Sequence, residues 1–226
     1  MRIALIPARG GSKRIPHKNI KDFCGRPILA YSIEVAQKSG LFEAIVVSTD
    51  DERIAAIAKH LGARVPFLRP AHLSDDSTGT LPVIAHAAER LELGSDDLLC
   101  CLYPTAPLLE SSSLILGLEA LEGEVSYTFG AVRYDYPPQR SFMLKENGAP
   151  TMLFPEHFQS RSQDLNPIFH DAGQFYWARA ETWRAQEPIF TPSARAIVLD
   201  PLRVQDIDTL EDWKLAEMKY RLLESS

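Results

Sequence analysis

Short apolar runs alternate along this chain with segments whose apolar residues recur at helical spacing. The runs at 2–7, 44–50 and 97–104 are nearly continuous, as is typical of strands buried on both faces of a parallel sheet. Residues 26–40 and 51–62 have helical spacing, and each segment ends in a glycine, which favours a helix stop. This alternation predicts an α/β fold with a mostly parallel sheet and helices on both of its faces.

The same alternation continues toward the end of the chain. We expect further helices at 80–92, 111–121 and 180–186, and further strands at 64–68, 125–132, 173–178, 196–201 and 203–208. The last helix should begin at Thr209, because Asp212 follows at the spacing of a capping box. Its expected core stripe consists of Leu210, Trp213, Met218 and Leu222. Asp51 is expected to cap the helix at 51–62.

Residues 133–170 break this rhythm. They are rich in proline and aromatic residues, so we interpret them as an excursion from the main sheet, a small β-arm or flap. The main pattern resumes at 173–178 with an apolar run. The sequence therefore predicts a single domain over residues 1–226 with one inserted arm.

Composition and net charge exclude several classes of function. The net charge of −6 argues against a nucleic-acid-binding protein, which usually has a basic face. Three cysteines, Cys24, Cys100 and Cys101, do not suggest a disulfide framework, so we expect a cytoplasmic protein. No apolar stretch approaches the length of a membrane span, so no membrane partner is expected.

Positive charge is concentrated in the loop after the first strand, "IPARGGSKRIPHKN" at 6–19. Gly10 and Gly11 let a backbone come close to a phosphate, while Arg9 and Lys13 supply charge and Ser12 supplies a hydroxyl donor. The loop matches neither the Walker A spacing nor GxGxxG. We interpret it as a polyphosphate cradle, the alternative being a tight turn with solvated cations.

Several segments resemble a known family. Residues 6–33, "IPARGGSKRIPHKNIKDFCGRPILAYSI", resemble the N-terminal signature of the sugar-acid cytidylyltransferases, and "RPAHLSDDSTGT", "LYPTAPL" and "QDIDTLEDW" match further family segments. The resemblance spans the chain from end to end. It implies a Rossmann-like nucleotide-diphospho-sugar transferase fold. It also implies transfer of CMP from CTP to a nonulosonic acid, with release of pyrophosphate.

The sugar is suggested by three segments, "KRIPHKNIKDFCG", "PFLRPAHLSDDSTGT" and "HDAGQFYWA", which most resemble the branch that acts on pseudaminic acid. Neuraminate enzymes tend to have Gln where this chain has Tyr103. N-acetylneuraminate, legionaminate or another sugar acid stay open as alternatives. So does a catalytically silent nucleotide-binding module, although Lys13, Asp206 and Asp208 count against it.

The resemblance also implies roles for individual residues. The nucleotide would be bound by Arg9, Gly10, Gly11, Ser12, Lys13, Lys18, Asn19, Arg69, Thr78 and Thr80. Within this set, Lys13 and Arg9 are the expected catalytic residues, and the alternative for Arg69 is a surface salt bridge. The sugar would contact Tyr103, Arg161, Gln163, Asp171 and Gln174.

Two further expectations concern a metal ion and a partner chain. Asp206 and Asp208 match the position of the family's metal acids, and on a strand their side chains would share one face, so we expect Mg²⁺ there. The alternative is that Asp208 caps the last helix. In the family, an arm at the position of 133–170 builds a homodimer and reaches the partner's active site, so we expect both properties here.

Overall fold

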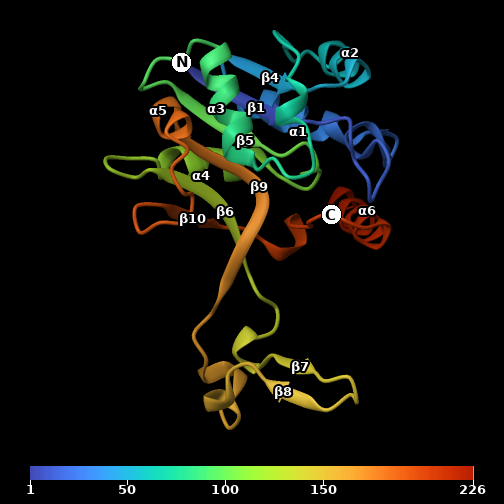
Figure 1. The fold of residues 1–226 in the computed structure, drawn as a ribbon, viewed down its shortest axis with the longest axis vertical. Helices are drawn as coiled ribbons and strands as arrows, with labels where there is room; N and C mark the ends of the chain where they lie inside the picture. Colours follow the sequence, from blue (N-terminus) through green and yellow to red (C-terminus); the bar gives the residue numbers. More distant parts are fainter. Residues whose placement is uncertain (226) are drawn as a thin grey trace.

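A six-stranded sheet forms the centre of the molecule (Figure 1). The structure is a computed structural model that describes residues 1–225. Its strands are β1 (Arg2–Pro7), β4 (Ala44–Ser48), β5 (Leu98–Leu102), β6 (Tyr127–Arg133), β9 (Phe169–Arg179) and β10 (Arg195–Val198), in the order β10-β6-β9-β5-β1-β4. Only β9 runs against the others, pairing antiparallel with both β5 and β6. The predicted mostly parallel sheet is confirmed.

Helices cover both faces of this sheet, as predicted. Strand β1 shows why, because its side chains alternate between two hydrophobic clusters. Ala4 and Ile6 pack with residues of α1 (Ile28–Ser39), α2 (Glu52–His60) and α4 (Ser111–Glu119). Ile3 and Leu5 pack on the other face with residues of α3 (Thr80–Arg90) and α5 (Ala180–Arg184). Burial on both faces explains the continuous apolar runs.

The predicted stop of α1 and the predicted caps of α2 and α6 (Leu210–Glu224) are confirmed. Gly40 ends α1 with φ of 65°, a left-handed conformation that glycine adopts without a Cβ clash. The Asp51 carboxylate caps α2, accepting from the backbone N–H of Arg53 at 2.7 Å. Thr209 caps α6 and forms the expected capping box with Asp212, so Asp208 is not the cap.

Two predicted strands do not form. Residues 64–68 make only isolated bridges to β4 and the residue that follows it, and Pro66 has no N–H with which to extend the ladder. Residues 203–208 pair with no strand. Instead, lysine ammonium groups donate hydrogen bonds to backbone carbonyls of this segment. Lys219 donates to the carbonyl of Val204 at 2.7 Å, and Lys18 donates to that of Ile207 at 2.7 Å.

The predicted core stripe of α6 is wrong for three of its four residues. Leu210, Met218 and Leu222 are exposed, at 52%, 65% and 52%. The helix instead packs through Trp213 and Tyr220, whose rings lie 5.5 and 5.7 Å from the ring of Phe23. The helix carries apolar residues on more than one side, so its sequence left two possible buried faces, and the aromatic one is buried.

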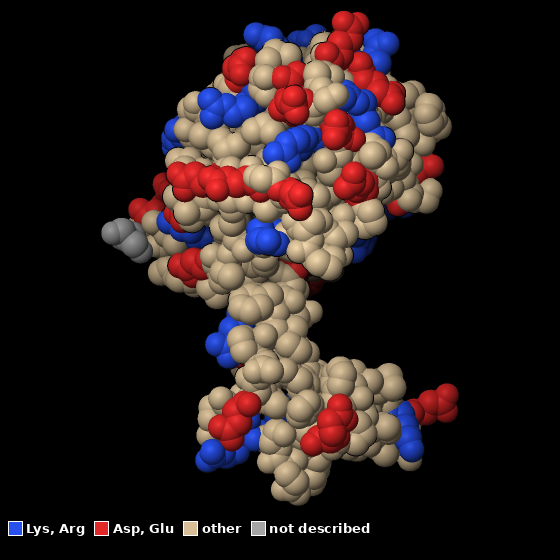
Figure 2. All heavy atoms as spheres, turned by 90° about the vertical axis from the view of Figure 1, so that its left-hand side faces the viewer, with Lys and Arg blue, Asp and Glu red and all other residues tan. Residues whose placement is uncertain are grey.

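An arm leaves the sheet between Arg133 and Phe169, the last pair of the β6–β9 ladder (Figure 1). It contains the predicted β-structure, an antiparallel hairpin of β7 (Phe142–Leu144) and β8 (Pro150–Met152). On the face drawn in Figure 2, charged residues of both signs cover much of the main body, the stalk is mostly uncharged, and charged residues appear again on the arm. In the described part of the chain, no helix has the length and apolar character needed to cross a bilayer.

Candidate active site

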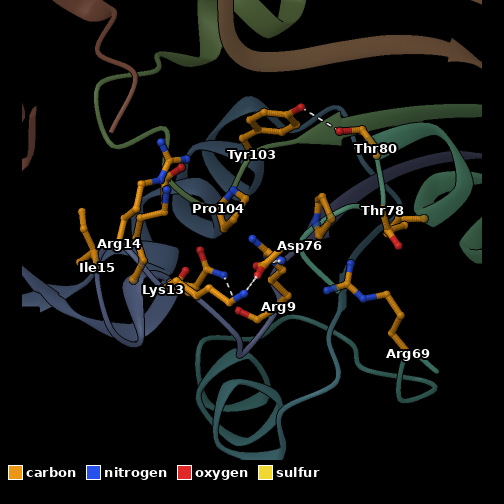
Figure 3. Close-up of a pocket in the computed structure, with 17 residues that line it drawn as sticks. Arg9, Lys13, Arg14, Ile15, Arg69, Asp76, Thr78, Thr80, Tyr103 and Pro104 are labelled. Carbon is orange, nitrogen blue, oxygen red and sulfur yellow. Dashed lines mark hydrogen bonds and ion pairs between the residues drawn. The ribbon is translucent and has the colours of Figure 1, made fainter. Parts of the chain in front are cut away.

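A cavity of about 530 Å³ opens beyond the carboxyl ends of β1 and β5 (Figure 3). Ligands of doubly wound sheets bind at this edge, where loops from several strands meet. The cavity brings together most of the predicted nucleotide residues with one predicted sugar residue. Among the residues that line it are Arg9, Ser12, Lys13, Lys18, Asn19, Arg69, Thr78, Thr80 and Tyr103.

The two glycines of the opening loop are not part of the cavity lining. The Gly10 N–H donates to the Asp50 carboxylate at 2.9 Å. A Cβ added at Gly10 would lie 2.8 Å from the Asp51 side chain, whereas one at Gly11 would meet open space. Gly10 is therefore required for the close contact between the loop and the start of α2.

Arg9 and Lys13 converge on one carboxylate. Arg9 donates to Asp76 at 2.7 Å and to the backbone carbonyl of Asp75 at 2.7 Å, and Lys13 forms an ion pair with the other oxygen of Asp76 (Figure 3). Lys13, followed by Arg9, holds the pKa of Asp76 below its usual value. Two cations from the opening loop thus reach a single anionic group inside the cavity, as phosphate binding requires.

The opening loop is also tied to the end of the chain. Arg14 pairs with Asp208 at 2.8 Å, and the Lys18 ammonium lies 3.7 Å from the same carboxylate. Burial lowers the pKa of Lys18. Asn19 is buried and donates to the backbone carbonyl of Arg9 at 2.8 Å, which fixes the start of the loop. Asp208, nearly two hundred positions away in the sequence, therefore holds two cations of the cavity lining in place from behind.

Arg69 is a buried cation rather than a surface salt bridge. It is only 5% exposed, its Nε donates to Ser74 at 3.2 Å, and its Nη2 lies 3.8 Å from Asp50. Figure 3 shows its guanidinium turned toward Arg9. Among the described residues, Nη2 has no hydrogen-bond partner, and burial lowers the pKa of the group. An unpartnered buried donor beside an open cavity is suited to a ligand acceptor.

Thr78, Thr80 and Tyr103 form the far side of the cavity. The Tyr103 hydroxyl and the Thr80 Oγ1 lie 2.9 Å apart, and burial raises the pKa of Tyr103 to about 12 (Figure 3). Thr78 donates its hydroxyl to Asp75 at 2.7 Å. The hydroxyls of Thr78 and Ser77 lower the pKa of Asp75 to about 2, so Asp75 stays ionised and holds this loop in shape.

The predicted sugar residues are not all brought together within one chain. Asp171 lies near the start of β9 and Gln174 near its middle, where the backbone N–H of Tyr103 donates to the Gln174 carbonyl at 2.8 Å. Gln174 is buried and donates to the Arg203 carbonyl at 2.6 Å. Arg161 and Gln163 lie instead on the arm, far from the cavity, and Arg161 pairs with Asp164 at 2.9 Å (Figure 1).

Asp206 and Asp208 offer a pair of hard oxygen ligands. Asp206 forms no ion pair with any of residues 1–225, and partial desolvation, followed by the charge of Asp208, raises its pKa. It lines a second cavity of about 410 Å³ at the root of the arm. Within the described residues, no group of three or more metal-ligating side chains exists. Two carboxylates fit an ion that takes its remaining ligands from phosphates and water.

Sequence reasoning did not assign Asp76 or Arg14 to the site. Both line the cavity, and each pairs with a residue that was assigned, Asp76 with Arg9 and Arg14 with Asp208. A signal for Asp76 is present in the sequence, because it is an acid in "RPAHLSDDSTGT", a segment that resembles the family and contains the predicted nucleotide residues Arg69, Thr78 and Thr80.

Comparisons with known proteins bear on the family to which this chain belongs. The cytidylyltransferase family model matches residues 3–193. A pseudaminic acid cytidylyltransferase of Campylobacter jejuni is 44% identical over 97% of this chain and 96% of that one. A CMP-N,N'-diacetyllegionaminic acid synthase of Legionella pneumophila is 30% identical over 97% and 96%. The solved CMP:2-keto-3-deoxy-manno-octonic acid synthetase in complex with CTP shares the fold, with a TM-score of 0.71, 14% identity and coverage of 100% and 99%. The chain belongs to the cytidylyltransferase family.

Proposed function

We propose that this protein transfers CMP from CTP to the anomeric oxygen of a nonulosonic acid, with pseudaminic acid as the preferred sugar. The observation that carries the proposal is the convergence of Arg9 and Lys13 on one anionic group inside the cavity. The 44% identity to a pseudaminic acid cytidylyltransferase supports the choice of sugar. We place the reaction in the cytoplasm, because Cys24, Cys100 and Cys101 are free thiols, as a reducing compartment keeps them.

The proposed chemistry is an in-line displacement at phosphorus. The anomeric hydroxyl loses its proton to water as its oxygen bonds to the α-phosphorus of CTP, and pyrophosphate leaves with the electron pair of the broken P–O bond. Negative charge builds on the phosphate oxygens, and Arg9 and Lys13 reach the position where they can stabilise it. Arg69 offers its free Nη2 donor to the nucleotide. Magnesium held by Asp206 and Asp208 would supply further neutralisation of phosphate charge.

The decisive test is pyrophosphate release from CTP in the presence of Mg²⁺, with each sugar acid offered separately. We expect release with pseudaminic acid, little with N-acetylneuraminic or legionaminic acid, and loss of activity when EDTA removes divalent ions. Release with only another sugar acid would support the proposed CMP transfer but contradict pseudaminic acid as the preferred substrate. Binding of CTP without release for any sugar acid would favour a silent nucleotide-binding module.

Asp76 forms ion pairs with Arg9 and Lys13, which CTP would have to displace. Asp76→Asn should therefore lower the KM for CTP. The Lys13 side chain is 83% exposed and that of Asp76 39%, and solvent screening of this pair limits the expected decrease to roughly two- to fivefold. Steady-state kinetics with CTP varied would measure it. Asp96→Asn is the control, because Asp96 is an exposed acid before β5, away from the cavity lining. A higher KM for Asp76→Asn would instead make Asp76 a residue that helps to hold the nucleotide.

We further propose a homodimer in which the arm completes the partner's sugar site. The arm carries large apolar side chains that are more than half exposed in the single chain, namely Phe142, Met143, Leu144 and Phe158. Such a patch is typical of an interaction surface. Arg161 also belongs to the segment between β8 and β9, on the arm that extends away from the main body, and does not line its own chain's cavity (Figure 1). A bidentate arginine from the partner would suit the carboxylate of a sugar acid.

Mixed dimers distinguish this arrangement from a site within one chain. Lys13→Ala and Arg161→Ala homodimers should each be nearly inactive. Refolding or co-expressing the two together should restore about a quarter of wild-type activity, because half of the dimers would contain one intact shared site. A monomer with full activity at micromolar concentration, or no recovery in verified mixed dimers, would contradict the proposal.

A further inference from the structure

Strand β9 contains a bulge beside the candidate site. Its ladder with β6 shifts register there, because Phe129 pairs with Tyr176 whereas Ala131 pairs with Asp171. The extra residues of β9 include Gly173, whose φ of 61° lies in the left-handed region. The bulge bends the strand so that the side chains of Asp171 and Tyr176 meet, although regular strand spacing would not place them together.

Both oxygens of the Asp171 carboxylate are used to fix this bulge. One accepts from the backbone N–H of Gly173 at 3.0 Å, and the other accepts from the Tyr176 hydroxyl at 2.5 Å. No cation among residues 1–225 forms an ion pair with Asp171, so the phenol is its main side-chain donor. Burial, followed by Tyr103 and Asp171, raises the pKa of Tyr176, which therefore stays a protonated donor.

Tyr176 in turn supports the wall of the nucleotide cavity. Its side chain is buried, and its ring lies 5.4 Å from the ring of Tyr103 at an angle of 52°. Tyr103 lines the cavity and shares a hydrogen bond with Thr80 at the start of α3. A continuous path of contacts therefore runs from Asp171 through Tyr176 to Tyr103, and only Tyr103 and Thr80 face the cavity.

We propose that Tyr176 is a positioning residue for the sugar acid. Its phenol, anchored on Asp171, holds the Tyr103 ring in the orientation that the sugar acid requires. The inference rests on the proposed function. It reassigns Asp171 from a sugar contact to an anchor, because each of its carboxylate oxygens accepts a hydrogen bond from within β9 itself. Thr80, a predicted nucleotide residue, keeps its own hydrogen bond with Tyr103 when the anchor is lost. Loss of the anchor should therefore weaken binding of the sugar acid more than binding of CTP.

Tyr176→Phe tests this through separate Michaelis constants. We expect the KM for the sugar acid to rise roughly tenfold, since a buried hydrogen-bond donor is lost, with the KM for CTP changed by less than about twofold. Tyr127→Phe is the matched control, because Tyr127 is a buried phenol on β6 that donates to Glu187 and does not line the cavity. Both variants should unfold at similar temperatures. An unchanged sugar KM in an active Tyr176→Phe enzyme would overturn the inference.

A double-mutant cycle separates an anchor from a sugar contact. Asp171→Ala should raise the sugar KM to a similar degree, and the double variant should be no worse than either single variant, because both act through one contact. A further increase in the double variant would mean that Asp171 binds the sugar directly, and would overturn its role as an anchor.

A third measurement does not depend on activity. With 3-fluorotyrosine incorporated, the ¹⁹F resonance of Tyr103, assigned through Tyr103→Phe, should move in Tyr176→Phe and Asp171→Ala but stay in place in Tyr127→Phe. A Tyr103 resonance that stays in place in all three variants would refute the inference even in an active enzyme. Failure of the wild type to release pyrophosphate with any sugar acid would overturn the proposed function, while this resonance would still report on the anchor.

Discussion

Lys13→Ala is expected to lower kcat/KM for CTP by roughly 10²- to 10³-fold, the usual cost of removing one group that stabilises transition-state charge. Lys13 reaches the same carboxylate as Arg9, so its ammonium can lie where phosphate charge develops. The fold should not suffer, because the side chain is 83% exposed and its ion pair is with the exposed Asp76. Steady-state kinetics and thermal unfolding, measured together, would separate these two effects.

Lys59→Ala provides the matched control for Lys13→Ala. Lys59 is an exposed lysine on α2 that does not line the cavity, so its loss should leave both kinetics and unfolding unchanged. Lys13→Arg should recover part of the activity, because it keeps the charge while changing its shape. A Lys13→Ala enzyme within a few-fold of wild type would refute the catalytic role and leave Arg9 as the main phosphate cation.

The features that sequence predicted well are set by local rules. Continuous apolar runs identified β1, β4 and β5, since burial on both faces leaves no room for polar alternation. The ends of α1, α2 and α6 followed from Gly40, Asp51 and Thr209, whose roles depend on their own backbone and near neighbours. The carboxyl ends of parallel strands then place their loops at one edge, so the opening loop and Tyr103 meet there.

The features that sequence missed depend on contacts between distant residues. The extended segment 203–208 looked like a strand, but its carbonyls accept from Lys18 and Lys219, which no local pattern connects to it. Apolar residues lie on several sides of α6, so its sequence alone does not determine the buried face. The contacts of Trp213 and Tyr220 with Phe23 determine it. Likewise, the pairing of Asp171 with Tyr176 arises from a register shift in the ladder, which strand periodicity does not reveal.

Arg69 shows how a costly side chain can indicate a ligand. Burying a cation without full hydrogen bonding destabilises a fold, and the pKa of Arg69 is lowered by that burial. Its hydrogen bonding is incomplete, since Ser74 accepts from Nε at 3.2 Å, whereas Nη2 lies 3.8 Å from Asp50 and has no hydrogen-bond partner among residues 1–225. The arrangement therefore adds little to the stability of the free protein. A ligand that accepts a hydrogen bond from Nη2 would be stabilised by it in the complex.

Arg69→Met should therefore weaken CTP binding roughly 10- to 100-fold while leaving the free energy of unfolding of the free protein unchanged or higher. Methionine keeps most of the buried stem but removes the desolvated charge, and Asp50 keeps its hydrogen bond from the Gly10 N–H. Titration calorimetry with CTP and denaturant unfolding would measure the two quantities. Arg64→Met, at an exposed arginine of the same segment, should change neither. A less stable Arg69→Met protein with unchanged CTP affinity would show instead that the guanidinium serves the fold, and that the nucleotide lies elsewhere in the cavity.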